Sequence, residues 1–237
     1  MRITLYFFLF LFLLNCEDNQ SKKKNIETTK PEVQKEEIVK QKDTIKDAIL
    51  EPKREFPLLT DKNAMEFFLE YEKHNKENKV RITTGFGEID ILLFNETKFH
   101  RANFIFLTKQ KYFDGTQFYR IVKNFIIQGG SSDEMEIANR RRNIGKYLLP
   151  KDTKHGFTHD RGVISMPSSE IENPHKLASP YQFFIVQRTS NHLDGDYTVF
   201  GRVIKGMDVV DEIAEQETDN AEWPLHNVYI KKVEIID

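Results

Sequence analysis

The chain has 237 residues, of which 39% are hydrophobic and 30% charged, a balance typical of one globular domain with polar additions. Its formal net charge of −2 excludes a global electrostatic attraction to nucleic acid or to an acidic membrane surface. Its single cysteine, Cys16, excludes an intrachain disulfide and a structural zinc site built on several thiolates.

A short apolar segment follows Met1 and Arg2. Residues 3–14 are almost wholly apolar, which fits the apolar region of a secretory signal. They are too few to span a bilayer as a helix, which needs about 20 residues. A buried core helix is the alternative, but the segment has no amphipathic face.

The apolar segment ends in Leu-Leu-Asn-Cys at residues 13–16, which resembles a bacterial lipobox. Asn15 departs from that pattern, which prefers Gly, Ala or Ser before the cysteine. The resemblance implies a signal peptide over residues 1–16 and lipidation of Cys16, so we expect a lipid-anchored protein of the cell envelope. Glu17 and Asp18 resemble export signals to the outer-membrane surface, and the periplasmic face is the other location. An ordinary signal with an incidental cysteine remains the alternative.

Residues 17–55 have the composition of a flexible tether. They contain ten Lys or Arg, ten Asp or Glu, no aromatic residue and no glycine. Such a segment cannot bury enough apolar area to offset the entropy lost on ordering. If flexible, it would extend roughly 30–40 Å on average. A short coiled-coil stretch is the alternative.

An additional helix is predicted over residues 61–78, between the tether and the main domain. Ala64, Phe67, Phe68 and Tyr71 recur at helical spacing. We therefore assign residues 56–79 to an N-terminal helix and residues 80–237 to one domain, which includes all eleven glycines.

Short strand-like runs dominate residues 80–237. They are Val80–Thr84, Gly87–Phe94, Gln117–Val122, Phe125–Gln128, Gly162–Met166, Gln182–Gln187, Thr198–Ile204 and Val228–Ile235. Two helical stretches, Thr97–Gln110 and Met207–Glu217, interrupt them. This order predicts a mainly-β fold, an eight-stranded closed antiparallel barrel with two helices over its ends.

The most informative motif is FYRIVKNFIIQGG at residues 118–130. Strict alternation on a strand would place Phe118, Arg120 and Val122 on one face. An arginine among apolar neighbours is costly unless its charge meets water, a partner or a ligand. Gln128, which ends the next run, is a candidate to hold the guanidinium group of Arg120. A surface arginine paired with a nearby carboxylate is the alternative interpretation.

At this motif the chain resembles the cyclophilin family, which carries Phe-His-Arg, a Phe, a Gln and Gly-Gly in the same order and spacing. Further matching blocks are RANF at 101–104, GVISM at 162–166, QFFI at 182–185, LDG at 193–195, VFG at 199–201 and GM at 206–207. The resemblance covers residues 80–237. It implies an eight-stranded barrel with an active-site groove on its outer surface and peptidyl-prolyl cis-trans isomerase activity.

The resemblance also implies a role for each matching position. Arg120 corresponds to the catalytic arginine, and Gln128 and Gln182 to the polar positions that orient the arginine and the substrate backbone. The apolar pocket for the proline ring would be formed by Phe125, Ile126, Phe184 and Leu193.

The chain departs from the family pattern at several positions. Tyr119 replaces a histidine, and Ser168 stands where an asparagine usually contacts the substrate backbone. His192 replaces a tryptophan that many members use to contact cyclosporin, and Tyr197 replaces a pocket histidine. Residues 131–160 do not match the common pattern, and we expect them to shape substrate preference.

Rotation about an Xaa-Pro bond breaks no covalent bond, so we expect no cofactor and no metal. His155 and His159 have the spacing of helical metal ligands, but Gly156 between them favours a polar loop. The expected partners are proline-containing polypeptides and, through Cys16, a membrane, with no nucleic acid and a monomeric state. The alternatives are a non-catalytic module that binds proline-containing peptides and a structural surface lipoprotein.

Overall fold

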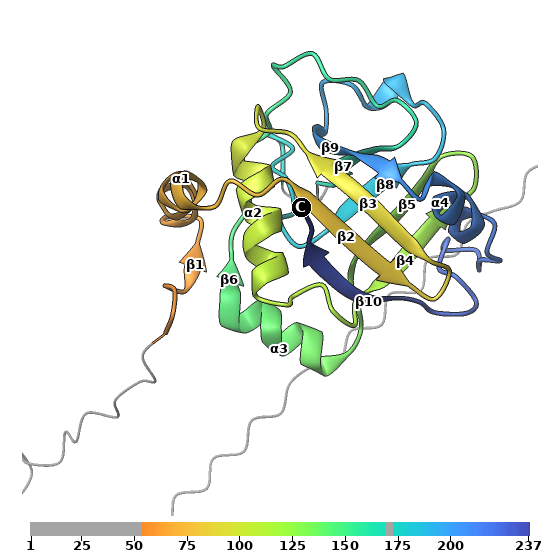
Figure 1. Cartoon of the computed structure of the whole chain (residues 1–237), viewed down its shortest axis with the longest axis horizontal. Coiled ribbons are helices and arrows are strands. Elements are labelled where there is room, and N and C mark those ends of the chain that lie inside the picture. Colours follow the sequence, from red (N-terminus) through yellow and green to blue (C-terminus); the bar gives the residue numbers. More distant parts are fainter. Residues whose placement is uncertain (1–53, 169–172) are drawn as a thin grey trace, which may run out of the picture. The chain divides into compact units, whose positions relative to one another are not determined.

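The computed structural model describes residues 54–168 and 173–237 (Figure 1). The predicted signal peptide, Cys16 and all but the last two residues of the predicted tether therefore lie outside the described residues. Residues 54–237 form one compact unit.

A closed antiparallel β-barrel organises this unit. Its eight strands are β2 (Lys79–Thr84), β3 (Glu88–Leu93), β4 (Gln117–Val122), β5 (Ile126–Ser131), β7 (Val163–Met166), β8 (Phe183–Val186), β9 (Thr198–Lys205) and β10 (Val228–Ile235). Their order around the barrel is β10-β2-β3-β9-β7-β8-β5-β4, and β4 pairs with β10 to close it. The predicted eight-stranded barrel is confirmed.

Two helices pack against the barrel as predicted, α2 (Lys98–Lys109) and α4 (Met207–Ala214). Helix α2 contacts β9 and β10, whereas α4 contacts β3, β4 and β5. In Figure 1 they lie at opposite ends of the strands. The close approach of α4 requires Gly87, because a Cβ atom there would lie 2.8 Å from the Val209 side chain.

A third helix, α3 (Met135–Ile144), lies in the segment to which the sequence assigned no structure. Only Ile137 and Ile144 of this helix are buried, which leaves too narrow an apolar stripe to predict it. Gly145 follows it with φ 142° and opens the two-residue strand β6 (Gly145–Lys146), which pairs in parallel with β1 (Leu59–Thr60). A Cβ atom at this glycine would lie 1.9 Å from the carbonyl oxygen of Leu59, so this pairing requires glycine.

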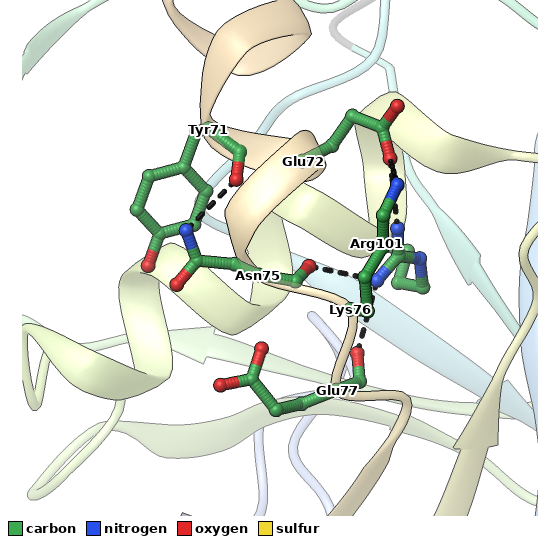
Figure 2. A network of polar contacts seen from close by, with 6 residues as sticks. All are labelled: Tyr71, Glu72, Asn75, Lys76, Glu77 and Arg101. Atoms are coloured by element: carbon green, nitrogen blue, oxygen red, sulfur yellow. Dashed lines mark hydrogen bonds and ion pairs between the residues drawn. The ribbon is translucent and has the colours of Figure 1, made fainter.

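The additional helix, α1 (Ala64–His74), is shorter than predicted and packs on α2 through the guanidinium group of Arg101 (Figure 2). The Arg101 side chain is 2% exposed. It donates hydrogen bonds to the carbonyl oxygens of Asn75 (3.0 Å) and Glu77 (3.1 Å) and to the Glu72 carboxylate (3.2 Å). A cation at the C-terminal end of a helix stabilises its unpaired carbonyl groups. Arg101 therefore joins α1 to the barrel domain.

Strand β4 does not follow the strict alternation that its sequence suggests. A register shift lies between Phe118 and Arg120, so Tyr119 is an extra residue opposite β5. Phe118 and Ile121 are buried in the barrel interior, whereas Tyr119, Arg120 and Val122 are only partly buried. The prediction that Phe118 and Arg120 share a face was therefore wrong, because a bulge changes the side-chain period locally.

Candidate active site

Three predicted site residues lie in one line across three neighbouring strands. Arg120 on β4 pairs with Gln128 on β5, which in turn pairs with Phe184 on β8. Paired residues of adjacent strands project to the same face of a sheet, and strands lie about 4.8 Å apart. The backbones of Arg120 and Phe184 therefore lie roughly 10 Å apart, measured across the strands, on the outer face of the barrel.

A second apolar cluster covers this outer face, separate from the barrel interior. It contains the buried residues Ile126, Val163, Phe184, Val186 and Val199, with Phe94, Val122, Phe125, Phe157, Leu193 and Tyr197 packed against them. All four predicted pocket residues and Tyr197 therefore come together in it. We call this set the outer apolar cluster. An open cleft of about 780 Å³ adjoins it at Phe94 and Phe157, over β7 and β9.

Aromatic contacts define the part of the cluster near Arg120. The rings of Phe184 and Tyr197 meet edge to face with centroids 5.8 Å apart. His192 lies on the short 3₁₀ helix Asn191–Leu193, and its exposed ring stacks on Phe125 at 5.3 Å. His192 and Tyr197, two of the positions that depart from the family pattern, thus both supply rings to this region.

A buried histidine, which the sequence analysis assigned to a polar loop, packs against Phe184. The ring of His159 stacks on Phe184 at 5.9 Å. Its Nδ1 atom lies 2.7 Å from a carboxylate oxygen of Asp194, and its Nε2 atom lies 3.0 Å from the Ser165 hydroxyl. Burial lowers the pKa of His159, although Asp194 opposes the shift. A neutral imidazole therefore fixes the loop after the 3₁₀ helix against the aromatic cluster.

The Arg120 side chain lies at the surface with a carboxylate partner. Its Nε atom donates a hydrogen bond to Oε2 of Glu222 over 2.6 Å, and the two side chains are 36% and 42% exposed. The guanidinium is therefore neither buried nor sealed beneath the surface. The prediction that Gln128 holds it was wrong. Glu222 makes that contact, which is the surface arginine–carboxylate pair of the alternative interpretation.

Gln128 instead donates a hydrogen bond to the hydroxyl oxygen of Tyr119. Burial raises the pKa of Tyr119 to about 12, so its phenol is neutral at physiological pH. Tyr119 also lies against Trp223, with ring centroids 5.8 Å apart. These contacts fix the bulged residue beside Arg120.

The two remaining predicted site residues lie at the edges of the region. The backbone of Gln182 lies against Gly130 just before β8, where a Cβ atom on the glycine would approach within 3.2 Å. Ser168 forms an isolated bridge with Ala178, next to residues that are not described.

The described part of the chain contains no group of three or more His, Cys, Asp or Glu side chains that could hold a metal ion. His155 contacts Asp152 at 3.2 Å, whereas His159 contacts Asp194, so the two histidines have separate partners. Within the same residues, no helix is long and apolar enough to cross a membrane.

Comparisons with known proteins agree with this architecture. Residues 79–235 match the family model described as cyclophilin type peptidyl-prolyl cis-trans isomerase/CLD. Peptidyl-prolyl cis-trans isomerase CYP18-2 of Arabidopsis thaliana is 35% identical over 67% of this chain and 94% of its own length. A peptidyl-prolyl cis-trans isomerase of the bacterium Acinetobacter baylyi is 35% identical over 66% of this chain and 82% of its own length.

Some relatives are much longer. The chain is 35% identical to peptidyl-prolyl cis-trans isomerase-like 2 of Rhizopus delemar but covers only 30% of that protein. Among solved structures, a cyclophilin-type isomerase of Cryptosporidium parvum superposes with a TM-score of 0.58 and 26% identity, over 68% of this chain and 98% of its own. The matching barrel, the ordered sequence blocks and these relatives show that the chain belongs to the cyclophilin-type peptidyl-prolyl cis-trans isomerase family.

Proposed function

We propose that the protein accelerates rotation about Xaa-Pro bonds in envelope or secreted polypeptides. In this proposal Arg120 donates a hydrogen bond to the prolyl nitrogen of the twisted bond, while the outer apolar cluster holds the proline ring. The observation that carries it is the line from Arg120 through Gln128 to Phe184, which places a partly exposed cation beside an apolar surface.

The chemistry needs selective binding of the twisted bond. Rotation about an Xaa-Pro bond crosses a barrier of about 20 kcal/mol because resonance gives the C–N bond double-bond character. As the bond twists, the nitrogen becomes pyramidal and gains a lone pair. A guanidinium donor can bind that lone pair only in the transition state, so the interaction lowers the barrier without tightening substrate binding equally.

The apolar residues have a different task. Phe125, Phe184 and Leu193 would grip the proline ring while the preceding carbonyl group rotates. Their apolar surface also excludes water, which strengthens the electrostatic interaction between the guanidinium and the nitrogen.

The experiment is an Xaa-Pro isomerase assay on wild type and Arg120→Ala. We expect kcat/KM to fall by about 10²–10³, the usual effect of removing one preorganised donor. Activity within threefold of wild type would refute the catalytic role of Arg120. If wild type and Arg120→Ala bind a proline-containing peptide with equal affinity and neither accelerates isomerisation, the result would instead favour a non-catalytic binding module.

We also propose that the mature chain is lipid-anchored at Cys16. The support is the apolar segment at residues 3–14, followed by the chain's only cysteine. Mass spectrometry of the N-terminal peptide should show a diacylglyceryl-modified Cys16, and Cys16→Ser should move the protein from the membrane to the soluble fraction. An unmodified thiol in membrane-fractionated protein would contradict the anchor.

A further inference from the structure

We infer that Glu222 is a positioning residue for Arg120, and this inference rests on the proposed function. The carboxylate holds the guanidinium through Nε, which leaves the two Nη groups as donors for the substrate. Among the described residues, the Nη atoms of Arg120 have no hydrogen-bond partner. A donor that is held on one side and open on the other matches the geometry that transition-state stabilisation requires.

An arginine needs such an anchor at this position. Its long side chain has many rotamers, and fixing one of them costs conformational entropy. At 36% exposure, packing alone does not immobilise the Arg120 guanidinium. A charge-assisted hydrogen bond of 2.6 Å to Glu222 limits its motion before substrate arrives.

Hydrogen bonds within residues 219–223 stabilise the loop that carries Glu222. The Asp219 carboxylate accepts hydrogen bonds from the backbone N–H groups of Ala221 (2.8 Å) and Trp223 (2.9 Å). The backbone N–H of Asp219 donates to the carbonyl oxygen of Trp223, and that of Glu222 donates to the carbonyl oxygen of Asp219. These bonds close residues 219–223 into a tight turn.

The same loop is joined to β4 on both sides of Arg120. The backbone N–H of Ile121 donates a hydrogen bond of 2.9 Å to the carbonyl oxygen of Glu222. The Trp223 ring packs on Tyr119. Because the residues before and after Arg120 both contact the loop, the carboxylate and the guanidinium belong to one local unit.

The backbone of Glu222 is strained. Its φ is 65°, in the left-handed region that side chains other than those of Gly, Asn and Asp rarely adopt. That conformation is unfavourable and persists only where surrounding contacts impose it. Such outliers concentrate at functional sites, and here the strained residue carries the carboxylate that meets Arg120.

The test compares Glu222→Ala and Glu222→Gln with a matched control, Glu215→Ala. Glu215 forms an ion pair with Lys123 at 2.5 Å on the turn that joins β4 and β5, so it offers the same chemistry without Arg120. Kinetics are measured by NMR exchange on a proline-containing peptide. We expect Glu222→Ala to lower kcat about tenfold with KM within twofold, because a displaced donor weakens transition-state binding alone.

The other variants sharpen the result. Glu222→Gln keeps an oxygen acceptor and should recover part of the lost kcat, whereas Glu215→Ala should stay within 1.5-fold of wild type. In an Arg120→Ala background, Glu222→Ala should have no further effect on kcat. The Nε–H resonance of Arg120 should exchange slowly with solvent in wild type and rapidly in Glu222→Ala.

Each contrary result has a defined meaning. If Arg120→Ala loses activity while Glu222→Ala keeps kcat within twofold, the positioning inference fails and the proposed function stands. A higher kcat or lower KM in Glu222→Ala also overturns the inference, because the carboxylate would then be a blocking contact. If Arg120→Ala itself retains activity, the proposed function fails.

Discussion

Two arginines of this chain occupy opposite environments. Arg101 is buried, and three acceptors surround it where α1 meets α2 (Figure 2). Arg120 lies on the outer face of the barrel, is 36% exposed and contacts one carboxylate. The Nη donors of Arg101 are used in contacts within the fold, whereas the Nη donors of Arg120 remain available for a ligand.

The difference in burial between Arg101 and Arg120 predicts that the first stabilises the fold and the second acts on the substrate. Burial lowers the pKa of Arg101, although Glu72 and Glu77 oppose the shift, so the fold must supply partners for this cation. The exposed ion pair of Arg120 contributes little to stability, typically about 0–1 kcal/mol. Removing the first should damage the fold, and removing the second should damage the activity.

The largest expected effect tests the structural side of this comparison. Arg101→Ala should lower the free energy of unfolding by about 3 kcal/mol, because it removes a large buried side chain and leaves the carbonyl groups of Asn75 and Glu77 without this donor, whereas Glu72 keeps Lys76. Urea unfolding measures this loss, with Arg120→Ala as the control that should lose less than about 1 kcal/mol. An active-site titration should find unchanged activity per folded Arg101→Ala molecule. Lost activity in the folded fraction would remove the distinction between the two arginines.

A pH-dependent effect should come from His100, the neighbour of Arg101 on α2. Burial lowers its pKa to about 4, and its ring nitrogens have no hydrogen-bond partner among the described residues. The unfolded chain therefore binds a proton more readily than the folded one between pH 6.5 and 4, and stability falls as pH drops through that window. We expect a loss of about 2 kcal/mol between pH 7.5 and 5.

His100→Leu should remove this pH-dependent loss. His159 also has a lowered pKa but is present in both proteins, so the difference between their urea-unfolding curves isolates His100. If the free energy of unfolding depends on pH equally in the two proteins, the His100 imidazole is accessible to water in solution.

A smaller effect is expected for Arg140, which joins α3 to the loop after α2. Its guanidinium donates to the carbonyl oxygens of Lys111 (2.8 Å) and Asp114 (2.5 Å) at a partly exposed site. Arg140→Ala should lower stability by about 1 kcal/mol and leave kcat/KM within 1.5-fold. An activity loss as large as that of Arg120→Ala would show that exposure and unused donors do not distinguish the catalytic arginine.

The smallest effect concerns the pH dependence of catalysis. Because the pKa of Tyr119 is raised to about 12, its phenol keeps its proton and its contact with Gln128 up to pH 9.5. We expect kcat/KM to vary less than twofold between pH 7.5 and 9.5, measured by NMR exchange. A loss of activity with an apparent pKa below 10 would indicate that Tyr119 ionises near Arg120.

Most of the barrel could be predicted from the sequence because its strands carry regular apolar patterns between turn residues. Val80 and Ile82 on β2 show this pattern, with buried side chains at every second position. Helix α3 could not be predicted, because its buried face consists of two isoleucines. The bulge at Tyr119 could not be predicted either, since it depends on the register between two strands.

The candidate site divides in the same way. The apolar residues around Phe184 were predicted through the family resemblance and do cluster on one face. The contacts of Glu222 and His159 were not predicted, because each depends on a partner that is distant in the chain. Glu222 lies 102 residues from Arg120 in the chain, and its orientation follows from the Asp219 turn. No local pattern encodes such a contact.

The junction around α1 has a mechanical consequence. If the chain is tethered at its N-terminus, a pulling force would enter the folded unit near Arg54 and reach β1 and α1 before the barrel. The two-residue β1–β6 pair and the Arg101 hydrogen bonds would then bear the force before the barrel strands do. Under load these contacts would rupture first, and the eight-stranded barrel that carries the candidate active site would remain closed.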